Sequence, residues 1–180
     1  MTQQQADPIQ QGLSYMRHQG AKSFSEIDAM LERTENDWRQ CLEAMSDAQA
    51  TFKPAGEWCA KEVVGHVIST DRSINQDVAS LGGVEPPAER VEEVRVMGVV
   101  SENYEAMPIS GLCDMIVGVF MESRMLAGAL QKSEQLERSF PHPIFGPLNL
   151  KEWLAFHRIH SMDHIQQIDK IRADPGYPRI

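Results

Sequence analysis

The amino-acid sequence predicts an all-α fold, a four-helix bundle with long crossover connections. Residues of the buried type recur with the period of a helix in four long segments, which are residues 24–46, 59–81, 110–132 and 150–172. The alternation of apolar and polar residues that marks a half-buried strand is weak along the chain. Two of the joins between the four segments are long, and long joins in a helical bundle are typical of crossovers.

The N-terminal residues 1–23 are expected to form an extension of the bundle, which itself would span residues 24–180. Within this extension, residues 7–19 are predicted to form a short additional helix. The helix would end at Gly20 and pack on the outside of the bundle.

The first two long helices are predicted from residues that share one helical face. In the first helix these residues are Ile27, Leu31, Thr34, Trp38, Cys41 and Met45. In the second helix they are Val63, Val67, Ile74, Val78 and Leu81. Gly82 and Gly83 follow directly, and glycine after the last periodic residue is a common helix end.

The third predicted helix, residues 110–132, is the most apolar of the four. The last helix runs from Leu150 to about Arg172, and Asn149 is a suitable N-cap for it. We expect residues 84–108 and 133–148, which are both rich in proline, to be the long connections.

Length and charge narrow the range of functions. A chain of 180 residues suits one domain with a substantial core. The net charge of -9 argues against binding to nucleic acid or to anionic membranes, which both need a basic surface. The three cysteines form no C-x-x-C pair, so neither a disulfide framework nor a zinc finger is expected. With no signal-peptide pattern and no apolar run long enough for a membrane span, a cytoplasmic location is predicted.

The placement of the histidines is the most informative feature of the sequence. His160 and His164 lie four residues apart in the last predicted helix. Seen down the helix axis, His160 falls about 40° to one side of His164 and His157 about 20° to the other. Apolar residues of the same sector are Leu150, Trp153, Ile168 and Ile171. A buried imidazole must be hydrogen-bonded or ligated, and two at this spacing can reach a single metal ion.

We expect a third ligand, His66, from the second predicted helix. His66 lies beside Val63 at the edge of the apolar face, next to a seam of polar residues. Such a seam can line a pocket that holds a metal ion and its water. The candidate pocket residues are Glu62, Thr70, Asp77, His157 and Trp153.

A single histidine on an apolar face is more often an ordinary core residue than a ligand. A buried pair four residues apart, together with a third histidine on another apolar helix, favours a metal site instead. An H-x-x-x-H pair alone is frequent by chance. It is not the zincin motif here, because Ser161 follows His160 where that motif has its general-base glutamate.

Two stretches of the chain resemble the DinB-like, YfiT-type superfamily. The segment GEWCAKEVVGHVISTDRSI, residues 56–74, is similar to the family pattern E-W-S-x-x-E-V-x-x-H. The segment HPIFGPLNLKEWLAFHRIHSMDHIQQIDKI, residues 142–171, is similar to H-P-x-x-G-x-L-T-x-x-E-W-L-x-x-x-x-x-H-x-x-x-H-x-x-Q-I. Together with the helix lengths, the resemblance extends over about residues 24–172.

The resemblance implies a four-helix bundle in which His66, His160 and His164 bind one divalent metal ion. Cys59 departs from the usual Ser or Thr N-cap, which would weaken the start of that helix by about 1 kcal/mol. Neither this change nor Asn149, which replaces a threonine, alters a ligand position. Zinc, nickel and iron all suit neutral imidazoles, so the identity of the metal stays open.

Three function hypotheses follow. The resemblance implies a metal-dependent thiol S-transferase or related hydrolase acting on a small-molecule electrophile, with a low-molecular-weight thiol as a partner. The second hypothesis is a non-catalytic, metal-stabilised binding or stress-response module. The third is a metal-free helical interaction protein whose histidines are held by carboxylates such as Glu62 or Asp163. Bundles of this type often self-associate, so a homodimer is also expected.

Overall fold

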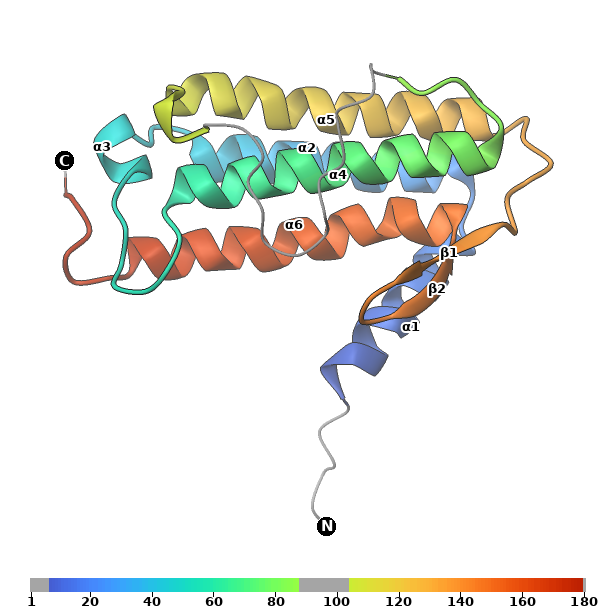
Figure 1. Cartoon of the computed structure of the whole chain (residues 1–180), viewed down its shortest axis with the longest axis horizontal. Helices are drawn as coiled ribbons and strands as arrows, with labels where there is room; N and C mark the ends of the chain where they lie inside the picture. The colour runs from blue at the N-terminus through green and yellow to red at the C-terminus, as the bar shows by residue number, and fades with distance from the viewer. Residues whose placement is uncertain (1–6, 88–103, 180) are drawn as a thin grey trace, which may run out of the picture.

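The computed structural model describes residues 7–87 and 104–179 and confirms the all-α bundle. Four long helices lie side by side along the molecule (Figure 1). They are α2 (Phe24–Leu42), α4 (Ala60–Gly82), α5 (Ile109–Leu130) and α6 (Leu150–Arg172). None of the helices in these ranges is long and apolar enough to cross a membrane.

The order of the helices around the bundle explains why its connections cross over. Helices α2 and α4 each pack against both α5 and α6, so α2 lies diagonally opposite α4. The colours in Figure 1 show that α4 and α5 run in the same direction, whereas α2 and α6 run the opposite way. Two parallel helices need a connection long enough to span the bundle, which agrees with the predicted long join at 84–108. Most of that join, residues 88–103, lies outside the described residues.

The first long helix is shorter than predicted. It ends at Leu42 rather than near residue 46, because Ala44 has a left-handed backbone with φ of 58°. The chain then forms the single turn α3 (Asp47–Ala50), where the Ser46 hydroxyl accepts the N–H of Gln49. This turn redirects the chain across the end of the bundle towards α4.

The predicted additional helix is present as α1 (Pro8–Gly20), which packs on α6. The Asp7 carboxylate caps it by accepting the N–H of Ile9. Beside α1 lies a hairpin that the sequence analysis did not predict, β1 (Ser139–His142) and β2 (Gly146–Asn149), in the segment expected to be only a connection. Phe140 of β1 stacks on Trp153 of α6 with ring centroids 4.2 Å apart. Packing on α6 therefore supports strands too short to be recognised from the sequence.

The core lies between the four long helices. Its largest fully buried side chains include Trp38, Phe120, Ile68, Leu112 and Leu130. The short helix η1 (Tyr104–Ala106) covers α4 beside Gly65, where the Tyr104 ring lies against the helix backbone. This arrangement places the residues around position 66 of α4 between η1 and α6.

Candidate metal centre

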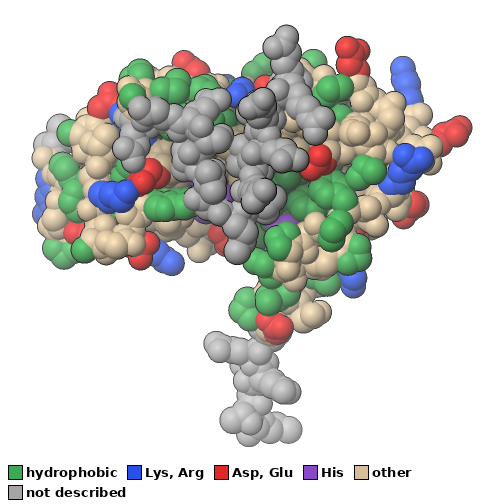
Figure 2. All heavy atoms as spheres, in the orientation of Figure 1, with side chains coloured by type: hydrophobic (Ala, Val, Ile, Leu, Met, Phe, Trp, Pro, Cys, Tyr) green, Lys and Arg blue, Asp and Glu red, His purple; other side chains and the backbone are tan. Residues whose placement is uncertain are grey.

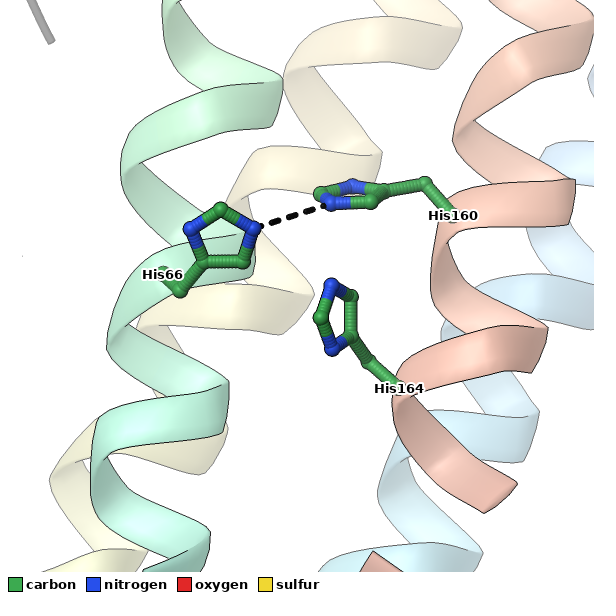
Figure 3. A group of neighbouring side chains, drawn as sticks. All are labelled: His66, His160 and His164. Atoms are coloured by element: carbon green, nitrogen blue, oxygen red, sulfur yellow. Dashed lines mark hydrogen bonds between the residues drawn. The ribbon is translucent and has the colours of Figure 1, made fainter. Parts of the chain in front are cut away.

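Three histidines from two helices converge in the bundle, as Figure 3 shows. His66 comes from α4, and His160 and His164 come from neighbouring turns of α6. One ring nitrogen of each lies within 4.8 Å of the corresponding nitrogens of the other two. The Nε2 atoms of His66 and His160 face each other at 3.3 Å. These are the residues that the sequence analysis singled out as candidate ligands.

Local sequence places the three rings at one height of the bundle. The Asn149 side chain caps α6 by accepting the N–H of Glu152, whose carboxylate accepts the N–H of Asn149 in return. This capping box sets the start of α6, and four residues along the helix then bring His160 and His164 onto the same face. Helix α4 packs directly against α6, so His66 projects towards the pair.

Each of the three histidines has a side-chain oxygen beside its Nδ1 atom. The Nδ1 of His160 lies 2.8 Å from Oδ1 of Asp71, and that of His164 lies 2.8 Å from Oε1 of Gln167. The Nδ1 of His66 lies 3.5 Å from the hydroxyl of Thr70. The Asp71 carboxylate and the Gln167 amide oxygen hold a proton on Nδ1 of His160 and His164 and leave the Nε2 lone pair of each for a ligand, whereas the Thr70 hydroxyl can either accept from or donate to His66.

Burial keeps two of the rings uncharged at neutral pH. Burial, together with the neighbouring His160 and His164, lowers the pKa of His66 to about 4. Burial and the neighbouring His160 likewise lower the pKa of His164 to about 4. Neutral imidazole is the form that binds a metal ion, so these two rings need not become uncharged before they bind one.

Sequence comparison relates the chain to one family of known proteins. A sequence model of the DinB superfamily matches residues 30–168, which include all three histidines. The chain belongs to the DinB superfamily. The uncharacterized protein YuaE of Bacillus subtilis (strain 168) is 29% identical in an alignment of 147 positions, and the match covers 75% of this chain and 90% of YuaE.

A solved structure shares the fold of this DinB superfamily member. YfiT from Bacillus subtilis, described as a probable metal-dependent hydrolase with an unusual four-helix bundle topology, matches with a TM-score of 0.65. The match covers 86% of this chain and 89% of YfiT at 19% sequence identity. At this identity the likeness shows the fold alone.

The most important residue that the sequence analysis missed in this DinB superfamily member is Asp71. Its side chain is fully buried, with Oδ1 at 2.8 Å from His160 Nδ1 and Oδ2 at 3.2 Å from His157 Nδ1. Burial raises the pKa of the Asp71 carboxyl, but His157 and His160 outweigh it and hold that pKa well below its usual range. The signal was an acidic residue four positions from the buried Val67 and three from the buried Ile68, inside the apolar face of α4.

The candidate pocket residues meet different outcomes. Thr70 contacts His66, and His157 reaches the site only through Asp71. Glu62 instead pairs with Lys53 at 2.6 Å and accepts the N–H of Cys59, so it holds the start of α4. The two others also lie elsewhere: Asp77 is exposed, and Trp153 packs under the hairpin and donates to the carbonyl of Phe140. The carboxylate that contacts His157 and His160 is that of Asp71, not that of Glu62 or Asp163.

Aromatic side chains shield the site from water. Phe156 stacks on the ring of His160 with an interplanar angle of 17°, and the Trp58 ring lies 5.2 Å from that of His66. His142 packs against Phe156, and its Nδ1 accepts the N–H groups of Ile144 and Phe145 in the hairpin turn. Figure 2 shows a few histidine atoms at the surface of this face, beside apolar side chains. His66 and His160 are only 8% and 9% exposed, so both rings are nearly buried.

The residues present fit a divalent transition metal. Two nitrogens bound to one tetrahedral zinc ion at about 2.0–2.1 Å would lie about 3.4 Å apart. The distance of 3.3 Å between the Nε2 atoms of His66 and His160 agrees with this value. Three imidazoles, each with a side-chain oxygen beside Nδ1, are also the donor set that such metals prefer.

Proposed function

We propose that the chain binds one divalent transition metal ion through the Nε2 atoms of His66, His160 and His164. With this ion bound, the protein acts as a metal-dependent hydrolase or thiol S-transferase. Its substrates would be small electrophiles. The observation that carries the proposal is the convergence of one ring nitrogen from each of three histidines, each of which has a side-chain oxygen beside its Nδ1 atom. The description of YfiT as a probable metal-dependent hydrolase supports it.

Each residue of the site has a separate task in this proposal. The three histidines bind the metal, and Thr70, Asp71 and Gln167 orient their rings. Phe156 and Trp58 exclude water from two sides of the site. A divalent metal with three imidazole ligands keeps open positions, acts as a Lewis acid and lowers the pKa of a water or thiol.

One observation also supports the second hypothesis, a metal that only stabilises the fold. The ligands come from α4 and α6, so an ion bound to them would join two helices distant in sequence. Turnover separates the two functions. A stabilising ion needs no substrate, whereas an enzyme must convert a substrate in a metal-dependent way.

Metal content is the first test. We would purify wild type, His160→Ala and the control His18→Ala without chelator or His-tag and measure metals by elemental analysis. His18 lies exposed on α1, so its loss removes an imidazole without touching the site. We expect about one equivalent of metal in wild type and His18→Ala and almost none in His160→Ala. Metal-free wild type, even after incubation with zinc or nickel, would exclude the metal proposal.

Activity is the second test. Metal-loaded and metal-free protein would be assayed for hydrolysis of a nitrophenyl ester and for transfer of cysteine or glutathione to a chromogenic chloronitrobenzene. We expect turnover only with metal, and loss of turnover in His160→Ala. Equal turnover by the metal-free protein would exclude a metal-dependent reaction, and no turnover of any electrophile would favour the stabilising role.

A further inference from the structure

A line of buried polar side chains leads from the metal centre to the far side of the core. We call Asp71, His157, Asn75 and Ser123 the buried polar chain. Asp71 contacts His160 on one side and His157 on the other, and His157 Nε2 lies 3.1 Å from Oδ1 of Asn75. Asn75 Nδ2 donates to Ser123 Oγ at 2.9 Å. All four side chains are at most 1% exposed.

The buried polar chain is anchored at Ser123, which is its end farthest from the metal centre. The Ser123 hydroxyl lies 2.9 Å from the carbonyl oxygen of Val119, one turn earlier in α5, and donates to it. The Ser123 Oγ atom accepts the side-chain N–H of Asn75, and Asn75 Oδ1 lies 3.1 Å from both Ser123 Oγ and His157 Nε2. Both ring nitrogens of His157 therefore face an oxygen, Nε2 that of Asn75 and Nδ1 that of Asp71, so the ring cannot turn without losing a contact. The contacts link α5, α4 and α6 behind the metal centre.

An aspartate in this position needs an explanation beyond packing. Removing an ionised carboxylate from water costs several kcal/mol, which only close partners offset. The side-chain partners of Asp71 in the described part of the chain are two histidines, one of them a proposed ligand. The Oδ2 of Asp71 and the Nδ1 of His157 lie 3.2 Å apart, an ion-pair distance, and neither atom has a hydrogen-bond partner within residues 7–87 and 104–179.

We propose that Asp71 is the positioning residue of the metal centre: its carboxylate holds the proton of His160 on Nδ1, so that Nε2 of His160 always presents a lone pair to the metal. His157, Asn75 and Ser123 hold the carboxylate in place. The part of this inference that concerns metal binding rests on the proposed function. The effect of Asp71 on the tautomer of His160 does not require a bound metal.

The positioning role of Asp71 predicts which ring nitrogens carry protons when no metal is bound. The Nε2 atoms of His66 and His160 are 3.3 Å apart, and two lone pairs would repel at that distance, so one of the two nitrogens must carry a proton. When His160 is neutral, Asp71 holds its single proton on Nδ1, so the shared proton belongs to His66. The structure therefore assigns Nδ1–H to His160 and Nε2–H to His66 before metal binds.

NMR of isotope-labelled histidine nitrogens tests the positioning role directly. In metal-free wild type at neutral pH we expect His160 in the Nδ1–H form and His66 in the Nε2–H form. In Asp71→Asn we expect a shift of His160 towards the Nε2–H form, because the amide can donate to Nδ1. The control Asp114→Asn removes an exposed carboxylate on α5 and should leave both forms unchanged. A wild-type His160 with its proton on Nε2 would overturn the proposal, whether or not Asp71→Asn folds.

Zinc affinity tests the consequence for the metal. Competition with a chromogenic chelator should give a Kd for zinc that is 10- to 100-fold weaker in Asp71→Asn than in wild type. Asp114→Asn should bind as tightly as wild type. A folded Asp71→Asn variant with unchanged His160 tautomer and unchanged zinc affinity would show a purely structural role. If wild type bound no zinc but showed the assigned tautomers, the proposed function would fail while the positioning role of Asp71 would stand.

Discussion

At the scale of the residue, burial sets the charge of the imidazoles and so their chemistry. Burial is the largest cause of the lowered pKa at His66, His142 and His164, and each falls to about 4. His142 does not belong to the candidate ligands, yet its Nδ1 accepts two backbone N–H groups and so also needs the neutral ring. Three histidines of the folded protein therefore resist protonation in the range where an unfolded chain accepts it.

The stability of the metal-free protein should therefore decrease as the pH falls. The unfolded chain protonates these histidines near 6.5 and the folded chain near 4, so the unfolded state holds more protons between those values. The free energy of unfolding should decrease as the pH falls from about 6.5 towards 4, by up to about 1.4 kcal/mol per pH unit for each histidine. Protonation of the Asp71 carboxylate lowers the free energy of unfolding further only at lower pH, since the pKa of Asp71 lies below the usual carboxyl range.

Denaturant unfolding at pH 7, 6 and 5, with chelator present, measures this dependence. His18→Ala is the matched control, because its exposed imidazole lies outside the buried set, and it should follow the wild type. A midpoint that stays constant from pH 7 to pH 5 would contradict the assignment of neutral buried histidines.

How much of the site the sequence could predict depends on the kind of signal each residue carries. His160 and His164 were predictable because their four-residue spacing places both on the apolar face of one helix. Asp71 was not recognised, because one acidic residue in a helix usually points to solvent and its partners lie 86 and 89 residues away on α6. Asn75 and Ser123 are polar residues with no motif, and only the packing of α4 against α5 brings them together.

At the scale of the element, the long helices followed from their periodicity, while the shortest elements, α3, η1 and the hairpin, did not. The four helices bury a continuous face, so many residues contribute to one signal. The helix break at Ala44 and the four-residue strands of the hairpin depend on a few tertiary contacts, such as Phe140 on Trp153. Close approaches are equally local: Gly65 lets the Tyr104 ring lie against α4 directly before His66.

The close approach at Gly65 gives a prediction with an internal control. A Cβ atom at Gly65 would lie 2.3 Å from Cδ2 and 3.0 Å from Cβ of Tyr104, so η1 would have to move. We expect Gly65→Ala to destabilise the protein by about 1–3 kcal/mol. A Cβ at Gly118 of α5 meets nothing within 4 Å, so Gly118→Ala should stabilise by about 0.5–1 kcal/mol. Guanidinium unfolding curves measure both, and a Gly65→Ala variant as stable as wild type would show that Tyr104 does not pack there.

At the scale of the whole molecule, the metal centre joins parts of the chain that the connections leave far apart. His66 lies on α4, and His160 and His164 lie on α6, after the long join and the hairpin. The two helices already pack together, so a bound ion adds a link to contacts that exist without it. Binding to the folded state alone must therefore raise the stability of the entire bundle.

Thermal unfolding with and without zinc measures that link. At a free zinc concentration about 100 times Kd, the folded state gains about 2.7 kcal/mol, which for a chain of this size raises Tm by about 5–10 °C. His18→Ala should show the same increase, because it retains the three ligands. His160→Ala should show almost none, because two histidines bind zinc more weakly and leave α4 and α6 joined by a single pair. An equal increase in His160→Ala would place the stabilising ion elsewhere on the molecule and separate it from the histidine cluster.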